Sequence, residues 1–196
     1  MRALLVIAAA AVIGAALAPG PAGGAGDGSR SAYLVGDSLA SGTALYLRDF
    51  LQGWRVEQDV RVGRQADAIP GLVAALGERL PRVVLVSAGT NGSPTAVTAF
   101  AEDVRAVLEL AGPKRCVIWA NVVRPPVAGT GYWRLNRTLT ALAQLHPSLV
   151  VFDWAALVRA HRDWLRADGV HAGPSGYRAR ARALAALATR CTASSA

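Results

Sequence analysis

A serine near the start of the chain stands where nucleophilic chemistry is possible. Ser38 lies in the stretch Gly36-Asp37-Ser38-Leu39, where a short apolar run ends and a helical pattern begins. A serine on a sharp strand-to-helix turn presents its hydroxyl where the unpaired N–H groups and positive end of the helix stabilise a developing anion. The alternative is that Asp37 or Ser38 only caps the helix, which both residue types favour.

A candidate base lies near the other end of the chain, in the Asp-Gly-Val-His sequence at 168–171. An aspartate three residues before a histidine can accept the imidazole Nδ1–H and fix its tautomer, which leaves Nε2 free to take a proton. An Asp-Gly turn with an incidental histidine is the alternative. The other two histidines, His146 and His161, lie on or at the ends of helical stretches without a comparable acid. His171 is therefore the best available base.

Two further motifs follow predicted strands. Gly63, in Val-Gly-Arg-Gln at 62–65, allows a backbone N–H to approach a ligand without an intervening Cβ. Asn91, in Gly-Thr-Asn-Gly at 89–92, carries an amide of the kind that oxyanion holes use. Each motif is also an ordinary turn sequence. Neither identifies a site by itself.

The elements that must position these residues alternate along the chain. Strand-like apolar runs lie at 32–36, 55–63, 82–89, 115–123 and 149–154. Helical patterns lie at 39–51, 67–80, 93–112, 132–146 and 173–190, the third with a serine cap at Ser93 and a proline at its first position. This alternation predicts an α/β fold with a parallel sheet covered on both faces. Ligands bind such sheets beyond the carboxyl ends of the strands, where all four motifs fall.

The bulk composition favours one globular domain. The chain has 196 residues, of which 53% are hydrophobic and 17% charged. Its net charge of +8 comes from 20 arginines and one lysine, Lys114, but these are scattered rather than interleaved with aromatic residues. We therefore expect no nucleic-acid partner. An anionic cell-surface polymer would suit the charge equally well.

The N-terminus is typical of a secretory signal. Met1-Arg2 is followed by an apolar run at 3–18 and a stretch of small residues. The run is shorter than the roughly 20 residues that span a bilayer. We expect a signal peptide at 1–25, a linker at 26–31 and the catalytic domain at 32–192. We therefore expect a secreted protein that associates with the cell wall, without stable membrane insertion after cleavage. An uncleaved anchor is the alternative.

Two cysteines, Cys116 and Cys191, lie in the expected exported part. An even count and an oxidising compartment favour a disulfide between a central strand and the last helix. Two unpaired thiols packed as small hydrophobic side chains are the alternative. The sequence has no cysteine-histidine spacing typical of zinc sites, so no metal is expected.

The order of the four motifs is similar to that of the SGNH/GDSL hydrolase family. The literal Gly-Asp-Ser-Leu stands at 36–39, and the resemblance runs from Tyr33 to Leu187. It implies a three-layer α/β/α, flavodoxin-like fold with a five-stranded parallel sheet in the order 2-1-3-4-5. It also implies esterase chemistry by a Ser-His-Asp triad, for which no cofactor is expected.

The resemblance also implies a role for each candidate residue. Ser38 is the expected nucleophile, His171 the general base and Asp168 its orienting acid. The expected oxyanion donors are the backbone N–H groups of Ser38 and Gly63 and the side chain of Asn91.

The chain departs from the common family pattern in two motifs. Gly92 stands where an aspartate often follows the asparagine, and 62–65 is not glycine-rich. These features, together with the stretch at 164–177, resemble the SGNH domains of bacterial peptidoglycan O-acetyltransferases.

Three functions remain open at this point. We expect a secreted, monomeric serine esterase that hydrolyses small acyl esters of the acetyl type, with O-acetylated cell-wall glycans as one substrate. Transfer of the acyl group to a sugar hydroxyl is the alternative, and an inactive wall-binding module is a third. Arg64, Arg124, Tyr132 and Trp133 are candidate substrate-binding residues, with ordinary packing and solvated charge as the alternative.

Overall fold

The computed structural model describes residues 30–193, which form a five-stranded sheet between two layers of helices. The expected signal peptide and most of the expected linker lie outside the described residues. The strands are β1 (Ser31–Gly36), β2 (Arg55–Val60), β3 (Val83–Ser87), β4 (Cys116–Ala120) and β5 (Leu149–Phe152). All neighbours pair in parallel, in the order β2-β1-β3-β4-β5. The α/β fold class and the strand order are therefore confirmed.

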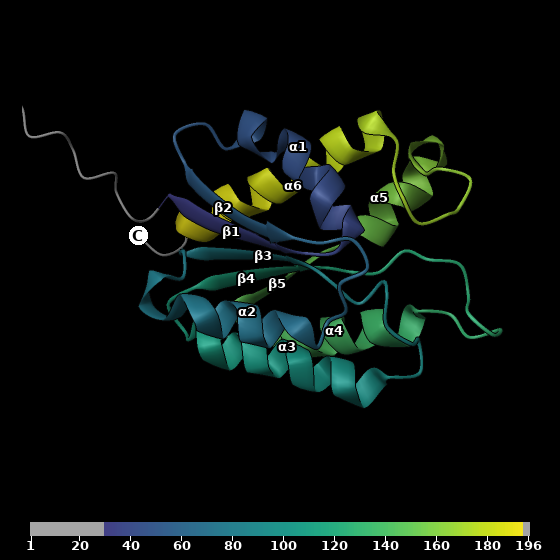
Figure 1. The fold of residues 1–196 in the computed structure, drawn as a ribbon, viewed down its shortest axis with the longest axis horizontal. Coiled ribbons are helices and arrows are strands. Elements are labelled where there is room, and N and C mark those ends of the chain that lie inside the picture. The colour runs from purple at the N-terminus through teal and green to yellow at the C-terminus, as the bar shows by residue number, and fades with distance from the viewer. Residues whose placement is uncertain (1–29, 194–196) are drawn as a thin grey trace, which may run out of the picture.

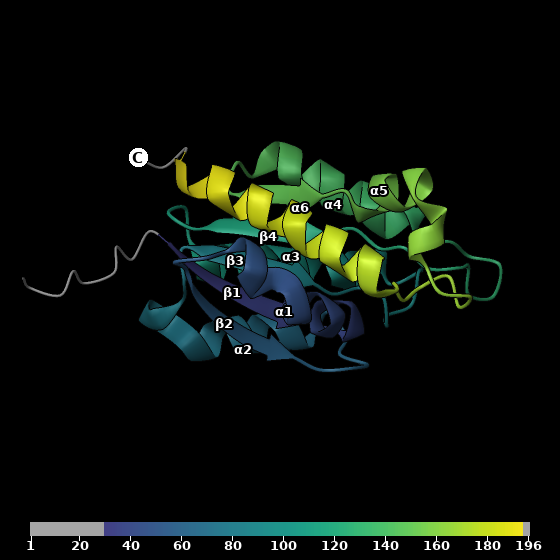
Figure 2. The ribbon, with the colours of Figure 1, turned by 90° about the horizontal axis from the view of Figure 1, so that it is seen from above.

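Helices cover both faces of the sheet. They are α1 (Ser38–Phe50), α2 (Ala68–Leu76), α3 (Val97–Ala111), α4 (Trp133–Leu145), α5 (Trp154–Ala160) and α6 (Pro174–Ala193), with short 3-10 turns η1 (Gly77–Arg79) and η2 (Arg162–Trp164). Helices α1, α5 and α6 lie on one face and α2, α3 and α4 on the other (Figure 1), and α1 and α6 run beside each other (Figure 2). Within residues 30–193, no helix is both long and apolar enough to cross a membrane.

The burial of the strands explains this layering. Every residue of β1 and β3 is buried, as expected for central strands covered on both faces. Strand β2 lies at the edge of the sheet and is mostly exposed or half-buried. Apolar side chains on the two faces form two separate cores, one against α2, α3 and α4 and the other against α1, α5 and α6.

Several predicted elements differ from those of the structure. Helix α3 begins at Val97 rather than at 93, because the Ser93 hydroxyl bonds to the Thr95 hydroxyl at 2.8 Å and to its N–H, which makes a turn. Residues 154–160 form a short helix that was not predicted. Ser31, assigned to the linker, is buried at the start of β1, where its hydroxyl accepts a hydrogen bond from the Arg82 N–H.

A disulfide joins the sheet to the last helix. Cys116 at the start of β4 is bonded to Cys191 in α6, with 6.0 Å between their Cα atoms. Because Cys116 is the first residue of β4, which ends at Ala120, the disulfide lies at the amino-terminal end of the strand. The disulfide is therefore at the edge of the sheet opposite the motifs at the strand ends.

Candidate active site

The turn between β1 and α1 depends on Gly36. A Cβ on this residue would collide with the carbonyl oxygen of Ser87 at the end of β3, and φ of Gly36 is +156°. The same carbonyl accepts a hydrogen bond of 2.9 Å from the Asp37 N–H. The missing side chain thus allows the end of β1 to lie close against β3 and turn sharply into the helix.

Asp37 caps helix α1. Its Oδ1 accepts hydrogen bonds from the N–H groups of Leu39 at 3.0 Å and Ala40 at 3.4 Å. Ser38 is the first residue of the helix and is half-buried. Asp37 therefore caps the helix, as one interpretation of this turn predicts, and the Ser38 side chain is left free for another contact.

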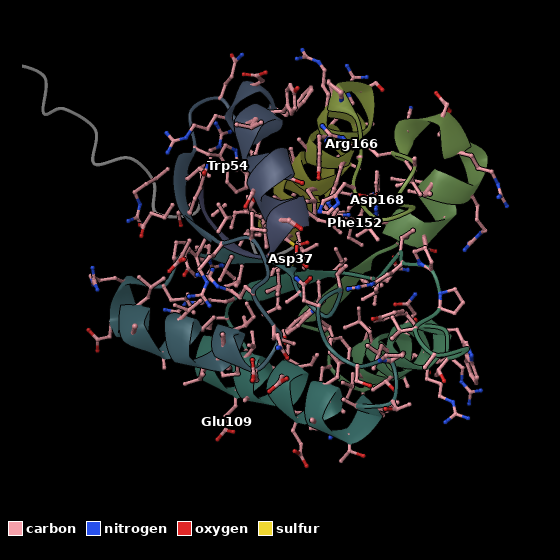
Figure 3. All side chains as sticks on the ribbon, turned by 45° about the vertical axis from the view of Figure 1, so that its right-hand side comes forward. Asp37, Trp54, Glu109, Phe152, Arg166 and Asp168 are labelled. Atoms are coloured by element: carbon pink, nitrogen blue, oxygen red, sulfur yellow. A yellow bond between two sulfur atoms is a disulfide. The ribbon has the colours of Figure 1, made fainter. Side chains whose placement is uncertain are left out.

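That contact is with His171. The Ser38 Oγ lies 2.9 Å from His171 Nε2, and His171 Nδ1 lies 2.7 Å from Asp168 Oδ2. The other Asp168 oxygen accepts hydrogen bonds of 2.9 Å from the N–H groups of Val170 and His171, which fix the loop before α6. Figure 3 labels Asp168 on this loop and Asp37 at the start of α1. A hydroxyl, an imidazole and a carboxylate are therefore aligned across segments far apart in the sequence, in the order that a Ser-His-Asp triad requires.

The electrostatics of this alignment favour an ionised Asp168. The hydrogen bond from His171, followed by those from the two backbone N–H groups, lowers the pKa of Asp168 to about 2. Both side chains are about half exposed, His171 at 39% and Asp168 at 47%. A carboxylate beside Nδ1 holds the tautomer in which Nε2 can accept the serine proton.

Asn91 and Gly63 lie on the loops that follow β3 and β2. Asn91 Nδ2 donates a hydrogen bond of 3.1 Å to the carbonyl oxygen of Arg64. An amide nitrogen has two hydrogens, so this bond orients the group and leaves a second donor. Gly63 has φ of +77° in a turn closed by Arg64 N–H and Arg61 O, and its own N–H has no hydrogen bond within the described chain. Both groups therefore retain a donor for a ligand.

Arg64 does not stand free for substrate, contrary to the prediction. Its side chain is 7% exposed, and Nη2 forms an ion pair of 2.6 Å with Asp59 Oδ1. Nη1 donates to the carbonyl oxygens of Asp59 and Gly36. The buried guanidinium holds the end of β2 to the β1 turn.

The side chains of Tyr132 and Arg124 also form hydrogen bonds within the protein, to backbone carbonyl oxygens. The Tyr132 hydroxyl donates to the Gly92 carbonyl oxygen at 2.9 Å, and Tyr132 is 4% exposed. Arg124 Nη1 donates to the Thr90 carbonyl oxygen at 2.6 Å, and its guanidinium lies 5.9 Å from the Tyr132 ring centre. The two side chains therefore support the loop that carries Asn91.

Trp133, the fourth candidate, is 53% exposed and lines a groove of about 500 Å³. The guanidinium groups of Arg134 and Arg137 lie 5.3 Å and 5.7 Å from its ring centre. The groove is lined by Asn121, Trp133, Asn136, Arg137, Thr140, Ala141, Gln144, Asp153, Ala155 and Arg159. Asn121 and Asp153 directly follow β4 and β5, so the groove opens at the same edge of the sheet as the triad.

Two residues near the site were missed from the sequence. Ser87 ends β3 and donates through Oγ to Asp37 Oδ1 at 3.2 Å, and Arg180 of α6 donates through Nη2 to Ser87 Oγ at 3.0 Å. A serine inside an otherwise apolar run was a usable signal for Ser87. Arg180 shares the buried face of α6 with Tyr177 and Leu184, at helical spacing. Within residues 30–193, no three metal-ligating side chains form a cluster.

Comparison with known proteins supports the fold. No family model and no curated protein matches the sequence. The catalytic domain of Streptococcus pneumoniae peptidoglycan O-acetyltransferase A, solved with a methylsulfonyl adduct, superimposes with a TM-score of 0.66 at 18% identity, covering 84% of this chain and 93% of that one.

Two hydrolase structures are similarly close. A lipolytic protein of the G-D-S-L family from Veillonella parvula has a TM-score of 0.63 at 20% identity, covering 80% of this chain and 96% of that one. A carbohydrate esterase of family 3 from Talaromyces cellulolyticus has a TM-score of 0.67 at 17% identity, covering 84% and 98%. The chain has the fold of the SGNH/GDSL hydrolases, which confirms the resemblance seen in the sequence.

Proposed function

We propose that this protein is a secreted SGNH-type serine esterase that hydrolyses small acyl esters of the acetyl type. The observation that carries the proposal is the continuous contact from Ser38 Oγ to His171 Nε2 at 2.9 Å and from His171 Nδ1 to Asp168 at 2.7 Å. Its place at the carboxyl edge of a parallel sheet agrees with where such folds bind ligands. The similar esterase and acetyltransferase structures support the same class of chemistry.

The mechanism follows from this geometry. Ser38 Oγ attacks the ester carbonyl carbon while His171 Nε2 takes its proton, and Asp168 stabilises the imidazolium. The N–H groups of Ser38 and Gly63 and the Asn91 amide are the proposed donors to the tetrahedral oxyanion. When the C–O bond breaks, His171 gives its proton to the leaving alcohol. Water then attacks the acyl-enzyme while His171 takes its proton. His171 returns that proton to Ser38 Oγ as the acyl C–O bond breaks, which releases the carboxylic acid and restores the starting state.

A glycan ester at the cell surface is the proposed substrate. The exposed Trp133 ring and the amide and hydroxyl side chains around it make a groove suited to a sugar ring. The signal-like sequence at 1–25 and the net charge of +8 agree with an anionic, wall-associated polymer. If the groove binds glycan, Trp133→Ala raises KM for an O-acetylated glycan and leaves KM for a small acetyl ester unchanged. Equal changes for both substrates would argue against it.

The esterase itself is tested with chromogenic esters from acetyl to octanoyl. Ser38→Ala is expected to lower kcat about 10⁴-fold or more, because the nucleophile is lost. Ser41→Ala is the matched control, since Ser41 lies in the same helix and its hydroxyl bonds to the Asp37 carbonyl oxygen. Turnover by Ser38→Ala at the rate of the unmodified protein would refute the proposal.

Transfer to a sugar hydroxyl is the second candidate function. It is favoured by the likeness to the pneumococcal O-acetyltransferase domain and by the open groove at the same edge of the sheet as the triad. The acyl-enzyme is the same, but the acceptor differs. Comparing the products from one acetyl donor with and without a glycan acceptor separates the two: free acetate in both cases indicates hydrolysis, and acetylated glycan indicates transfer.

A further inference from the structure

A fully buried arginine lies beneath the turn that carries Ser38. Arg180 of α6 is 0% exposed, and its guanidinium lies 4.9 Å from the Trp154 ring centre and 5.3 Å from that of Phe152. Its Nη2 donates to Ser87 Oγ at 3.0 Å, whereas Nε and Nη1 have no hydrogen-bond partner in the described chain. A buried cation is costly unless a nearby charge compensates it, so its position calls for a counter-charge.

That counter-charge is Asp37. Ser87 Oγ bridges the two groups, accepting from Arg180 and donating to Asp37 Oδ1 at 3.2 Å. Asp37 is 0% exposed, and its Oδ2 has no hydrogen-bond partner in the described chain. The two charges are thus linked through one hydroxyl inside the apolar layer between α1, β3 and α6.

The balance between burial and charge sets the ionisation of Asp37. Burial raises its pKa, and the Arg180 cation, the Leu39 and Ala40 N–H groups and the Ser87 hydroxyl act in the opposite direction. Burial lowers the pKa of Arg180 to about 10, so it stays charged at neutral pH. Among the described residues, Tyr177 of α6 also interacts with both charges. Burial raises the pKa of Tyr177, so its hydroxyl is neutral at neutral pH.

We propose that Arg180 is a positioning residue that keeps Asp37 a carboxylate and thereby holds Ser38 opposite His171. As an anion, Asp37 accepts hydrogen bonds at the start of α1. Once protonated, its remaining carbonyl oxygen is a weaker acceptor, and its new O–H faces N–H groups that cannot accept it, so the first turn is held less firmly. Arg180 also belongs to α6, which begins just after His171. Its contact with Asp37 through Ser87 therefore connects the helix after the proposed base to the turn that carries the proposed nucleophile. The inference rests on the proposed function.

The test compares Arg180→Met with Arg180→Lys and with Arg182→Met as control. Arg182 lies on the exposed face of the same helix, 5.4 Å from the Phe50 ring centre. We expect Arg180→Met to lower kcat for an acetyl ester about ten- to hundred-fold at neutral pH with little change in KM, as for a misplaced nucleophile. The kcat of Arg180→Met, divided by the kcat of the unmodified protein at the same pH, should rise with pH as Asp37 ionises. Arg180→Lys should restore most of kcat, and Arg182→Met should leave it unchanged.

A second measurement does not depend on turnover. An NMR titration of the labelled Asp37 carboxyl in the full chain is expected to show a higher pKa in Arg180→Met than in the unmodified protein. If the chain proves not to be an esterase, this titration still tests whether Arg180 controls Asp37. Should Arg180→Met fail to fold, Ser87→Ala breaks the bridge with a change of one atom and is expected to raise the same pKa. An unaltered Asp37 pKa, or a loss of kcat equal at every pH, would overturn the inference and leave Arg180 a packing residue.

Discussion

Ser38 owes its proposed reactivity to its neighbours rather than to its own side chain. A serine hydroxyl is a weak nucleophile until a base takes its proton, and His171 Nε2 lies 2.9 Å away. Placement at the first position of α1 adds the positive end of a helix at the atom where negative charge would develop. The aspartate before it caps the helix, which leaves the serine hydroxyl free to contact His171.

Asn91 provides a sharp test at the residue scale. Asn91→Ala is expected to lower kcat about 10²–10³-fold with a smaller change in KM, because an oxyanion donor acts mainly in the transition state. Steady-state kinetics on an acetyl ester measure this, with Ser93→Ala on the same exposed loop as control. A change in KM alone would place Asn91 in substrate binding instead.

The ionisation of Asp168 has a predictable effect on stability. Because its pKa in the folded protein, about 2, lies below the ordinary value of 3.8, the stabilisation from this carboxylate is complete above about pH 4 and is lost as the pH falls toward 2. Chemical denaturation should therefore show Asp168→Asn less stable than the unmodified protein at mildly acidic pH, and a smaller difference near pH 2. A difference that grows on acidification would contradict this assignment.

At the scale of elements, the segment between β4 and α4 supports the loop after β3. Tyr132 and Arg124 both donate to carbonyl oxygens of that loop, and Asn91 itself is tied to the loop after β2. Residues that sequence reasoning assigned to sugar binding therefore hold the proposed oxyanion donors in place. The sequence shows which residue types are available near the site, but not which of them the fold turns inward.

Tyr132→Phe tests this support. It removes the hydroxyl that donates to the Gly92 carbonyl oxygen and keeps the ring, so we expect a loss of about 1 kcal/mol in unfolding free energy. We also expect kcat to fall about ten-fold or more, as for a displaced catalytic group. Trp133→Phe is the control and should leave hydrolysis of a small ester unchanged. An unaltered kcat in Tyr132→Phe would show that the loop keeps its geometry without this bond.

At the scale of the whole molecule, the disulfide should affect stability and not chemistry. It closes a loop with a sequence separation of 75 residues, at the edge of the sheet opposite the triad. Replacing both cysteines by serine is expected to lower the unfolding free energy by about 2–4 kcal/mol. Denaturation of the double variant measures this loss, while kcat at room temperature should stay the same. A large fall in kcat would indicate that the disulfide also affects the geometry of the triad at the opposite edge of the sheet.

Much of this architecture could be predicted from the sequence. Apolar runs such as 82–89 are typical of strands in a sheet covered on both faces, and strands that alternate with helices favour parallel pairing. The strand order and the candidate site residues were predicted from the resemblance to one family, which rests on the order of the four motifs. The short α5 was missed because it follows β5 without a break. Arg180 could not be identified among 20 arginines, since its role depends on contacts from three distant segments.

The central claim is that Ser38 is an activated nucleophile, and covalent labelling tests it most directly. We predict that a fluorophosphonate probe adds once to the protein, that peptide mapping by mass spectrometry finds the adduct on Ser38, and that His171→Ala abolishes labelling. Absence of labelling in the folded protein, or an adduct on another residue, would contradict the account and favour an inactive wall-binding module.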